Sequence, residues 1–294
     1  MQAHSVYRAF FGLKDDPFSL SPDPAFLYRS EQHEEALSNL IYGVQARKGF
    51  IVLTGEVGTG KTTMLECLRD WLSQQQIEFA FIFNSRITAP EFLQMVAYDF
   101  DLRCDHKSKP EVLAALQEMA FRQNDRGSTS VLIVDECHNL DWDVLEEIRM
   151  LGNLENRHGK LLQIILAGQP EFDRKIDAPN LRQLKQRIVL RYGLKPLDET
   201  DTARYIQSRL KQAGMPNQQV FTPELISEIH SRSNGIPRII NAVCDNVLLC
   251  CFADAARVAT VDMLNEVTQD MRLEWQPSRL QFDPEAENLV PRMR

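Results

Sequence analysis

Short apolar runs alternate with longer amphipathic segments through the first two thirds of the chain. Five such runs are predicted to be strands: 50–53, 79–83, 131–134, 164–167 and 188–192. Around and between them, apolar residues recur at helical spacing in 30–45, 61–75, 90–102, 111–122 and 145–156. Continuous apolar strands that alternate with helices indicate an α/β fold, with a parallel sheet covered on both faces.

After Pro196 the strand signals stop, and helical spacing recurs in 198–213, 223–232, 236–255 and 261–272. Asp198 and Thr222 are plausible N-caps, and Pro223 suits a first helical position. At the other end, residues 5–30 are rich in aromatic residues and prolines. The pattern predicts four parts: an arm (1–30) that packs its rings on a body, an α/β core (31–196), a helical lid (197–272) and a loose tail (273–294).

Composition narrows the class of protein. The 33 basic and 41 acidic residues give a net charge of −8, and hydrophobic residues make up 44%. This is ordinary globular usage and argues mildly against a dedicated nucleic-acid coat. The six cysteines form no C-x-x-C pair, which favours reduced thiols in a cytosolic protein. No segment predicts a secretory signal or a membrane span.

A phosphate-binding motif follows the first predicted strand. The sequence fits G-x-x-x-x-G-K-[ST] and opens the next helix; its candidate nucleotide-binding residues are Gly55, Glu56, Val57, Gly58, Thr59, Gly60, Lys61, Thr62 and Thr63. The glycines let backbone N–H groups face phosphate oxygens, and the helix N-terminus adds partial positive charge. Lys61 is expected to reach the β- and γ-phosphates, and Thr62 to bind Mg²⁺. The motif predicts ATP and Mg²⁺ as ligands.

Two carboxylates end the third predicted strand. Asp135 and Glu136 are expected to face the phosphate loop, because ligands bind outside the carboxyl ends of parallel strands. Asp135 would orient Mg²⁺, and Glu136 would polarise the attacking water as general base. The alternative for Glu136 is a solvated cap residue. Cys137 and His138 follow, and we expect a packed thiol and a hydrogen-bonded imidazole rather than a metal site or a nucleophile.

The end of the fourth strand carries a polar side chain, Gln169. It is expected beside the γ-phosphate, where it could position water, or else it is a turn residue before Pro170.

Basic residues gather between Asp177 and Asp198, where no acid occurs: Arg182, Lys185, Arg187, Arg191 and Lys195. The run could be a solvated face, could bind nucleic-acid phosphates, or could offer an arginine finger to the nucleotide of a neighbouring subunit. Arg187 is the candidate finger, and Arg191 is expected to pair with an acid.

The helical lid contains one further candidate. Arg238 lies at a predicted helix start after Ser233-Asn234-Gly235-Ile236-Pro237. It could touch the nucleotide phosphates and couple the lid to the γ-phosphate, or it is a surface arginine.

Together these residues resemble an AAA+ ATPase. Gly55–Thr62 resembles Walker A, Val131–Glu136 Walker B, Gln169 sensor 1, Arg187 the finger region and Gly235–Arg238 sensor 2. The stretch Tyr7–Tyr28, followed by His33 and Glu35–Leu37, is similar to the ExeA/GspA family of bacterial secretion ATPases. That family includes ATPases of pilus assembly and of exopolysaccharide/exosortase gene clusters, and it is related to the TnsC/TniB transposition regulators.

The resemblance implies a five-stranded sheet in the order 5-1-4-3-2, a helical lid, and ATP bound between subunits of a ring or filament. It also implies that the arm near Phe26–Tyr28 contacts adenine. ExeA carries a membrane span and a periplasmic part after its ATPase, whereas this sequence stops at Arg294. The expectation is therefore the short, soluble type, cytoplasmic or peripheral at the inner membrane through a partner.

The resulting hypothesis is Mg²⁺-dependent ATP hydrolysis coupled to secretion, exopolysaccharide export or pilus-type assembly at the inner membrane. The alternative is a DNA-binding ATPase that regulates transposition, and its support is the arginine-rich run. A non-hydrolysing adaptor is disfavoured by Asp135 and Glu136. A small-molecule kinase is disfavoured by the helical lid.

Overall fold

The computed structural model describes residues 6–20, 26, 28–83, 86–104, 108–157, 159–215 and 220–273. Its centre is a sheet of five parallel strands: β1 (Phe50–Gly55), β2 (Glu78–Ile82), β3 (Ser130–Val134), β6 (Leu162–Gly168) and β7 (Ile188–Leu194). The strand order is β2-β3-β6-β1-β7. The expected five strands and their order are confirmed.

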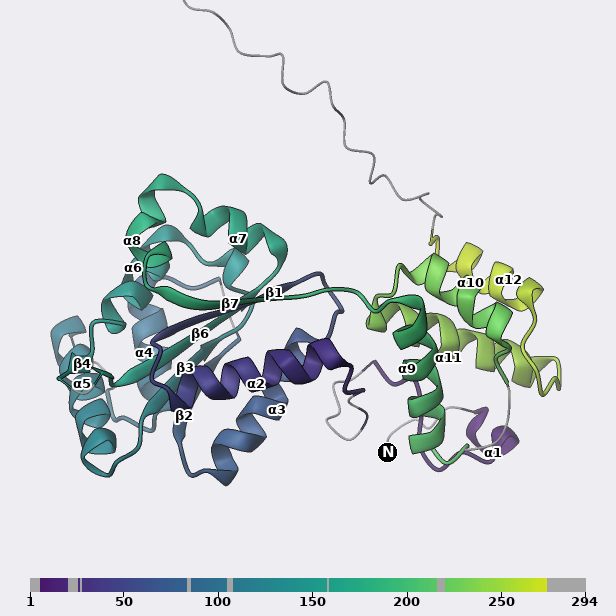
Figure 1. Cartoon of the computed structure of the whole chain (residues 1–294), viewed down its shortest axis with the longest axis horizontal. Helices are drawn as coiled ribbons and strands as arrows, with labels where there is room; N and C mark the ends of the chain where they lie inside the picture. The colour runs from purple at the N-terminus through teal and green to yellow at the C-terminus, as the bar shows by residue number, and fades with distance from the viewer. Residues whose placement is uncertain are drawn as a thin grey trace, which may run out of the picture.

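Helices cover both faces of this sheet (Figure 1). One face packs against α2 (Glu31–Gln45) and α3 (Lys61–Gln74). The other packs against α4 (Ala89–Asp99), α5 (Lys109–Asp125), α6 (Trp142–Leu151), α7 (Pro170–Ile176) and α8 (Arg182–Lys185). Side chains alternate between the two layers along β1, so Ile51 joins the first core and Phe50 the second. Burial on both faces explains why the strands are apolar without alternation.

Local capping sets several helix starts. The hydroxyl of Ser30 accepts a hydrogen bond from the backbone of His33 at the start of α2. Capping boxes begin α4 and α5, where Thr88 pairs with Glu91 and Ser108 with Glu111. These contacts satisfy N–H groups that a helix leaves without a partner.

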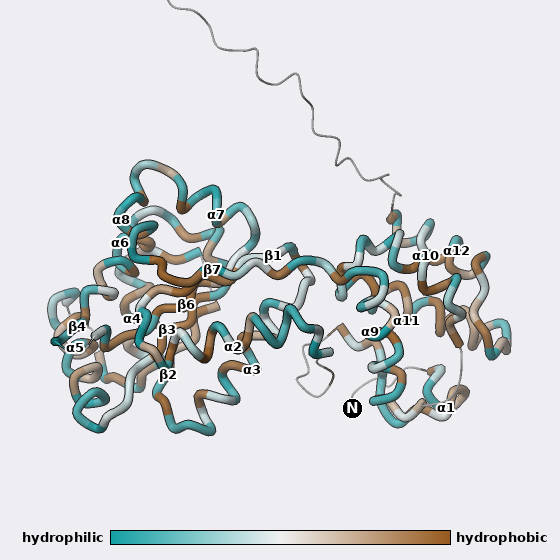
Figure 2. Tube along the Cα trace, viewed as in Figure 1, coloured by the Kyte–Doolittle hydropathy of each residue, from teal (hydrophilic) through white to brown (hydrophobic). Residues whose placement is uncertain are grey.

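A second unit of helices follows the sheet: α9 (Glu199–Gln212), α10 (Pro223–Ser233), α11 (Pro237–Ala253) and α12 (Val261–Asp270). The arm, with the short helix α1 (Arg8–Phe11), packs on these helices. Its rings Tyr7, Phe11 and Phe18 are buried in the same core as Ile229 and Val247. Figure 2 shows hydrophobic residues gathered inside both units, in the strands and between the lid helices.

Some expected elements differ in extent or were not anticipated. The segment 145–156 was expected to be one helix, but α6 spans Trp142–Leu151 and β4 (Glu155–Asn156) pairs with β5 (Gly159–Lys160). A Cβ on Gly152, which caps α6, would lie 2.2 Å from the Phe50 ring, so this end of the helix is packed tightly against the sheet. Helices α7 and α8 were not expected either. The predicted tail lies outside the described residues except for Leu273, and none of the described helices is long and apolar enough to cross a membrane.

Candidate active site

The polar strand ends converge at the carboxyl edge of the sheet. Gly55 ends β1, Asp135 follows β3 and Gln169 follows β6, and these three strands are neighbours in parallel register. The sequence-based expectation that they meet at one edge therefore holds in space. Ligands of parallel α/β sheets bind at this edge.

The loop between β1 and α3 depends on its glycines. Gly58 and Gly60 have φ values of 83° and 101°, in the left-handed region that favours glycine. A Cβ on Gly58 would lie 2.6 Å from the Cβ of Arg238, and one on Gly60 would lie 3.3 Å from Nε2 of His33. The glycines therefore allow both the turn and the close approach of the lid and of α2.

The ammonium of Lys61 lies inside this loop. Its Nζ donates to the carbonyls of Gly55 at 2.7 Å and Glu56 at 2.9 Å. Burial is the largest cause that lowers the pKa of Lys61, and the nearby carboxylates of Glu136 and Asp135 oppose it. A buried cation surrounded by loop backbone is suited to bind an incoming phosphate.

Thr62 and Asp135 carry side-chain oxygens that could bind Mg²⁺, and the two side chains are hydrogen-bonded to each other. The hydroxyl of Thr62 donates to Oδ2 of Asp135 at 3.2 Å, and Oδ1 of Asp135 accepts from the backbone of Glu136 at 2.8 Å. Octahedral Mg²⁺ with bonds of 2.0–2.1 Å holds adjacent ligand oxygens about 2.9 Å apart, so this pair fits the ion. Burial raises the pKa of Asp135, while its hydrogen bonds and Lys61 lower it.

No group of three or more His, Cys, Asp or Glu residues that could hold a metal occurs in the part of the chain that the structure describes. Mg²⁺ commonly takes one or two protein ligands and keeps water and phosphate for the rest. The donor set of Thr62 and Asp135 therefore fits a nucleotide-bound Mg²⁺ better than an all-protein metal site.

Glu136 has an unusual backbone. Its φ is 54°, left-handed for a residue that is not glycine, and it leads into a 3₁₀ turn, Cys137–Asn139. Such strain costs about 1–2 kcal/mol and is common at functional sites. Its side chain is 43% exposed and lines the same cavity as Lys61, but its Oε2 is buried and has no hydrogen-bond partner among the described residues.

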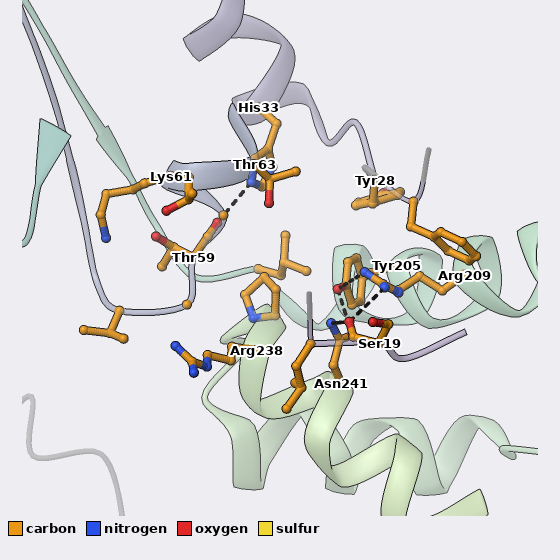
Figure 3. A pocket seen from close by; sticks show the side chains of 18 of the residues that line it. Ser19, Tyr28, His33, Thr59, Lys61, Thr63, Tyr205, Arg209, Arg238 and Asn241 are labelled. Atoms are coloured by element: carbon orange, nitrogen blue, oxygen red, sulfur yellow. Dashed lines mark hydrogen bonds between the residues drawn. The ribbon is translucent and has the colours of Figure 1, made fainter. Parts of the chain in front are cut away.

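One cavity of about 350 Å³ connects the loop with the lid and the arm (Figure 3). Its phosphate side is lined by 57–63, Glu136 and Arg238. Its other side is lined by Ser19, Leu20, Phe26, Tyr28, Leu197, Tyr205, Arg209 and Asn241. The volume suits a nucleotide-sized ligand.

Arg209 organises the far side of this cavity. The side chain is 7% exposed, and its guanidinium donates to the carbonyls of Pro17 and Ser19 in the arm and to the hydroxyl of Tyr205. Its carbon Cζ lies 5.2 Å from the centre of the Phe26 ring and 5.4 Å from that of Tyr205. Arg209 thereby fastens the arm to α9 at the cavity wall.

His33 connects the phosphate loop to the end of the arm. Its Nδ1 lies 2.6 Å from the Ser30 hydroxyl, and its Nε2 lies 3.2 Å from the carbonyl oxygen of Thr59. A carbonyl only accepts, so Nε2 donates and Nδ1 accepts from Ser30. Burial is the main cause that lowers the pKa of His33, while the Thr59 carbonyl and Asp201 raise it. His33 is therefore a neutral support of the loop.

Of the other predicted site residues, Arg238 lines the cavity and Gln169 does not. Arg238 is exposed at the start of α11, lines the cavity, and donates its backbone N–H to the carbonyl of Gly58 at 3.2 Å. Gln169 lies beyond the cavity lining, with its Nε2 3.0 Å from Nε2 of His138. This is the hydrogen-bonded imidazole expected from the sequence, and the thiol of Cys137 is fully buried, also as expected.

Arg187 lies at the opposite edge of the sheet. Ile188 is in register with Phe50, whereas Leu194 is in register with Gly55, and a strand of this length spans about 20 Å. Arg187 therefore cannot reach the phosphate loop of its own chain, and it donates to Oδ1 of Asn153 at 2.6 Å.

The arginine-rich run is partly neutralised by acids from outside it. Arg191 pairs with Asp173 at 3.5 Å, as expected, and Lys185 pairs with Asp177 at 2.9 Å.

Apart from Arg238, the sequence analysis did not predict the lid residues that line the cavity. Tyr205 and Arg209 lie on the buried side of α9, and Asn241 lies on that of α11. An arginine within an apolar helical stripe was the available signal, because a buried guanidinium needs fixed acceptors.

Residues 44–176 match the protein-family model described as "AAA domain". Among curated proteins, the chain is 44% identical over 249 residues to General secretion pathway protein A of Aeromonas hydrophila. This match covers 84% of the chain and 45% of that protein. The chain therefore spans less than half the length of this relative.

Solved structures with a similar fold include Cdc6p of Pyrobaculum aerophilum, with a TM-score of 0.69, 16% identity, and coverage of 88% of this chain and 71% of that one. The Drosophila ORC bound to DNA matches with a TM-score of 0.67 and 18% identity over 92% of this chain and 67% of that chain. The RuvB branch migration motor of Thermotoga maritima matches with a TM-score of 0.56 and 16% identity over 84% and 70% of the two chains. At this identity the likeness concerns the fold.

Proposed function

We propose that this chain, which contains a match to the AAA domain and is similar to General secretion pathway protein A, hydrolyses ATP to ADP and phosphate with Mg²⁺. One observation carries the proposal: Lys61, Thr62 and Glu136 line a single nucleotide-sized cavity, and Asp135 accepts a hydrogen bond from Thr62. Each supplies a different part of phosphoryl transfer to water.

Lys61 would exchange its two loop carbonyls for phosphate oxygens, and the backbone of 57–62 would surround the phosphates. Thr62 and Asp135 would hold Mg²⁺, which neutralises developing charge on the phosphates. Glu136 would accept the proton of the attacking water, and Arg238 would face the γ-phosphate from the lid. The rings of Phe26 and Tyr28 would face the base.

The direct test uses Glu136→Gln, which keeps shape and removes basicity. Phosphate release should fall at least about a hundred-fold while a fluorescent ATP analogue still binds. Glu118→Gln, on the exposed side of α5, is the matched control and should keep wild-type turnover. Wild-type turnover in Glu136→Gln would contradict the assignment of the general base.

We also propose that the ATP-binding site is completed between neighbouring subunits of a ring or filament. Arg187 of one subunit would be the arginine finger for the nucleotide bound to the next. The support is its distance from its own loop. Mixing Lys61→Ala with Arg187→Ala, each inactive, should restore part of the activity. Arg182→Ala is the control, because it removes another arginine of the same run. A mixture of Lys61→Ala with Arg182→Ala should show no more activity than Arg182→Ala shows alone. No rescue at any ratio would contradict a shared site.

The pathway we propose is secretion or export at the inner membrane, with the chain held there by a membrane partner. The support is the 44% identity to General secretion pathway protein A. Steady-state ATPase activity at two protein concentrations, with and without duplex DNA, separates this from the transposition-type alternative. Activity that rises with protein concentration and ignores DNA supports secretion, and activity that depends on DNA would contradict it.

A further inference from the structure

A side chain of α2 holds the start of the linker between the sheet and the lid. This linker, 195–198, runs from the end of β7 to the start of α9 (Figure 1). Nε2 of Gln32 donates to the carbonyl of Lys195 at 2.9 Å, and the backbone N–H of Lys195 donates to Oε1 of Gln32 at 3.1 Å. One side-chain amide therefore pairs with both polar groups of one backbone residue.

This pairing continues the hydrogen bonding of β7 where the sheet has ended. The last backbone partners of β1 and β7 are Gly55 and Leu194, because the chain after Gly55 turns into the phosphate loop. Lys195 lies beyond that pair, and the amide of Gln32 supplies the donor and the acceptor that a neighbouring strand would otherwise provide. A carboxylate or an ammonium could supply only one of the two.

Gln32 is itself held in place by the sheet and the phosphate loop. The hydroxyl of Tyr192 in β7 lies 3.0 Å from the carbonyl oxygen of Gln32 and 3.0 Å from Oε2 of Glu35. The residue after Gln32 is His33, whose Nε2 lies 3.2 Å from the carbonyl oxygen of Thr59. The first turn of α2 is thus fixed relative to both β7 and the nucleotide site.

The lid holds the linker at a second point. The N–H of Leu197 donates to the carbonyl of Gly235 at 2.9 Å, and a Cβ on Gly235 would collide with the carbonyl oxygen of Leu197. The core therefore holds Lys195, and the lid holds Leu197. Rotation within the linker is confined to the backbone on either side of Pro196, whose ring fixes its own φ.

We propose that Gln32 is a positioning residue that sets the hinge of the lid and thereby the place of Arg238 above the phosphate loop. The inference rests on the proposed hydrolysis of ATP. The lid and the loop touch where the N–H of Arg238 donates to the carbonyl of Gly58 at 3.2 Å. Without the pair between Gln32 and Lys195, the lid would adopt a wider range of angles. Arg238 would then face the γ-phosphate in only part of them.

The test begins with Gln32→Met in the full chain, which keeps the length of the side chain and removes both hydrogen bonds. Changes at a hinge often alter kcat and KM together, so we expect kcat to fall and KM for ATP to rise, with kcat/KM roughly ten-fold lower. Gln45→Met makes the same substitution at the exposed far end of α2 and is the matched control, with both constants unchanged.

Two results of this comparison would overturn the positioning role. One is unchanged kcat and KM in Gln32→Met. The other is a lower apparent kcat with an unchanged KM, because that is the result of losing folded protein alone.

Gln32→Glu separates the two hydrogen bonds. A carboxylate still accepts from the N–H of Lys195, but it has no donor for the Lys195 carbonyl. We therefore expect kcat/KM to stay below the wild-type value. Wild-type constants in Gln32→Glu would show that the amide pair is not needed and would overturn the inference.

Amide hydrogen exchange, followed by NMR, measures the contact without ATPase activity. In Gln32→Met the amide of Lys195 should exchange at least about ten-fold faster than in the wild type, whereas that of Leu197 should be unchanged. Equal exchange of the Lys195 amide in the two proteins would overturn the inference.

A wild-type protein without ATPase activity would instead contradict the proposed function, so the two failures are distinguishable. The Kd of a fluorescent ATP analogue would then test the hinge, because Arg238 lines the cavity. A weaker Kd in Gln32→Met than in Gln45→Met would support the inference, and equal values would overturn it.

Discussion

The two sides of the cavity are built in different ways. The phosphate side comes mainly from one continuous segment, 57–63, joined by Glu136 and by Arg238 of the lid. The other side comes from three segments that are distant in sequence: the arm, α9 and α11. The phosphate side uses backbone conformation and charge, whereas the other side uses buried rings and the guanidinium of Arg209. Chemistry and ligand retention are therefore expected to respond to different substitutions.

The largest effect is expected on the phosphate side. Lys61→Met removes the buried ammonium and should lower kcat/KM for ATP roughly 10²–10³-fold. The free energy of unfolding should not fall, because burial already disfavours the charged form of Lys61. Phosphate release and thermal unfolding measure the two quantities. A large loss of stability in Lys61→Met would contradict the view that the phosphate side contributes to activity rather than to stability.

The next effect is expected at Arg209. Arg209→Met removes the guanidinium donor from the carbonyls of Pro17 and Ser19, although Ser19 keeps the hydrogen bond from Asn241 at 3.5 Å. The free energy of unfolding should fall by about 2 kcal/mol. KM for ATP should rise roughly ten-fold with kcat nearly unchanged. This is expected when the lost contacts bind the substrate and the transition state equally. Lys211→Met, on the exposed side of the same helix, is the control. A fall in kcat without a change in KM would count against this division.

His33 allows the boundary between the two sides to be probed by pH. Its pKa is lowered from the ordinary value of 6.5, so below that pH the unfolded chain takes up the proton more readily than the folded one. The contribution of neutral His33 to the free energy of unfolding is therefore fully present above pH 6.5. It is lost as the pH falls toward the pKa that His33 has in the folded protein. His33→Gln keeps a donor for the carbonyl of Thr59. In this variant the urea concentration at the midpoint of unfolding should depend less on pH between pH 7 and 5.5 than in the wild type. An identical pH profile would exclude His33 as the source.

The smallest effect is expected at Tyr28. Its hydroxyl donates to Asp201 at 2.9 Å, and burial together with this carboxylate raises the pKa of Tyr28 to about 12. Tyr28→Phe removes one partly exposed hydrogen bond and should cost about 1 kcal/mol, with at most a two-fold change in KM. Tyr42→Phe, an exposed tyrosine on α2, is the control. A ten-fold change in KM would place Tyr28 among the main ligand contacts.

The same contrast explains what the sequence could predict. The strands and the phosphate loop follow from local signals: apolar runs, glycine spacing and the residues at strand ends. The order of the strands was implied by the resemblance to AAA+ ATPases. Asp135 and Glu136 could be placed because parallel strands end at one edge. The pairing of Arg191 with an acid was also anticipated, because Arg191 lies within a predicted strand.

The other side of the cavity could not be assembled in this way. Arg209 and Asn241 carry no motif, and their role depends on packing between segments about 190–220 residues apart. The arm was expected to pack on a body, but its sequence gives no sign that the lid, rather than the sheet, is that body. The β4–β5 hairpin was missed because its strands have only two residues each, too short for any periodicity.

The packing of the arm on the lid also bears on synthesis of the chain. Tyr7 contacts Asp245, which lies 238 residues later. At ribosomal rates of 5–20 residues per second, the rings of the arm would wait roughly 10–50 s for the lid helices that cover them. The whole sheet is made during that interval. Tyr7, Phe11 and Phe18 therefore leave the ribosome well before the helices that bury them, and their exposed rings favour chaperone binding until the lid has been made.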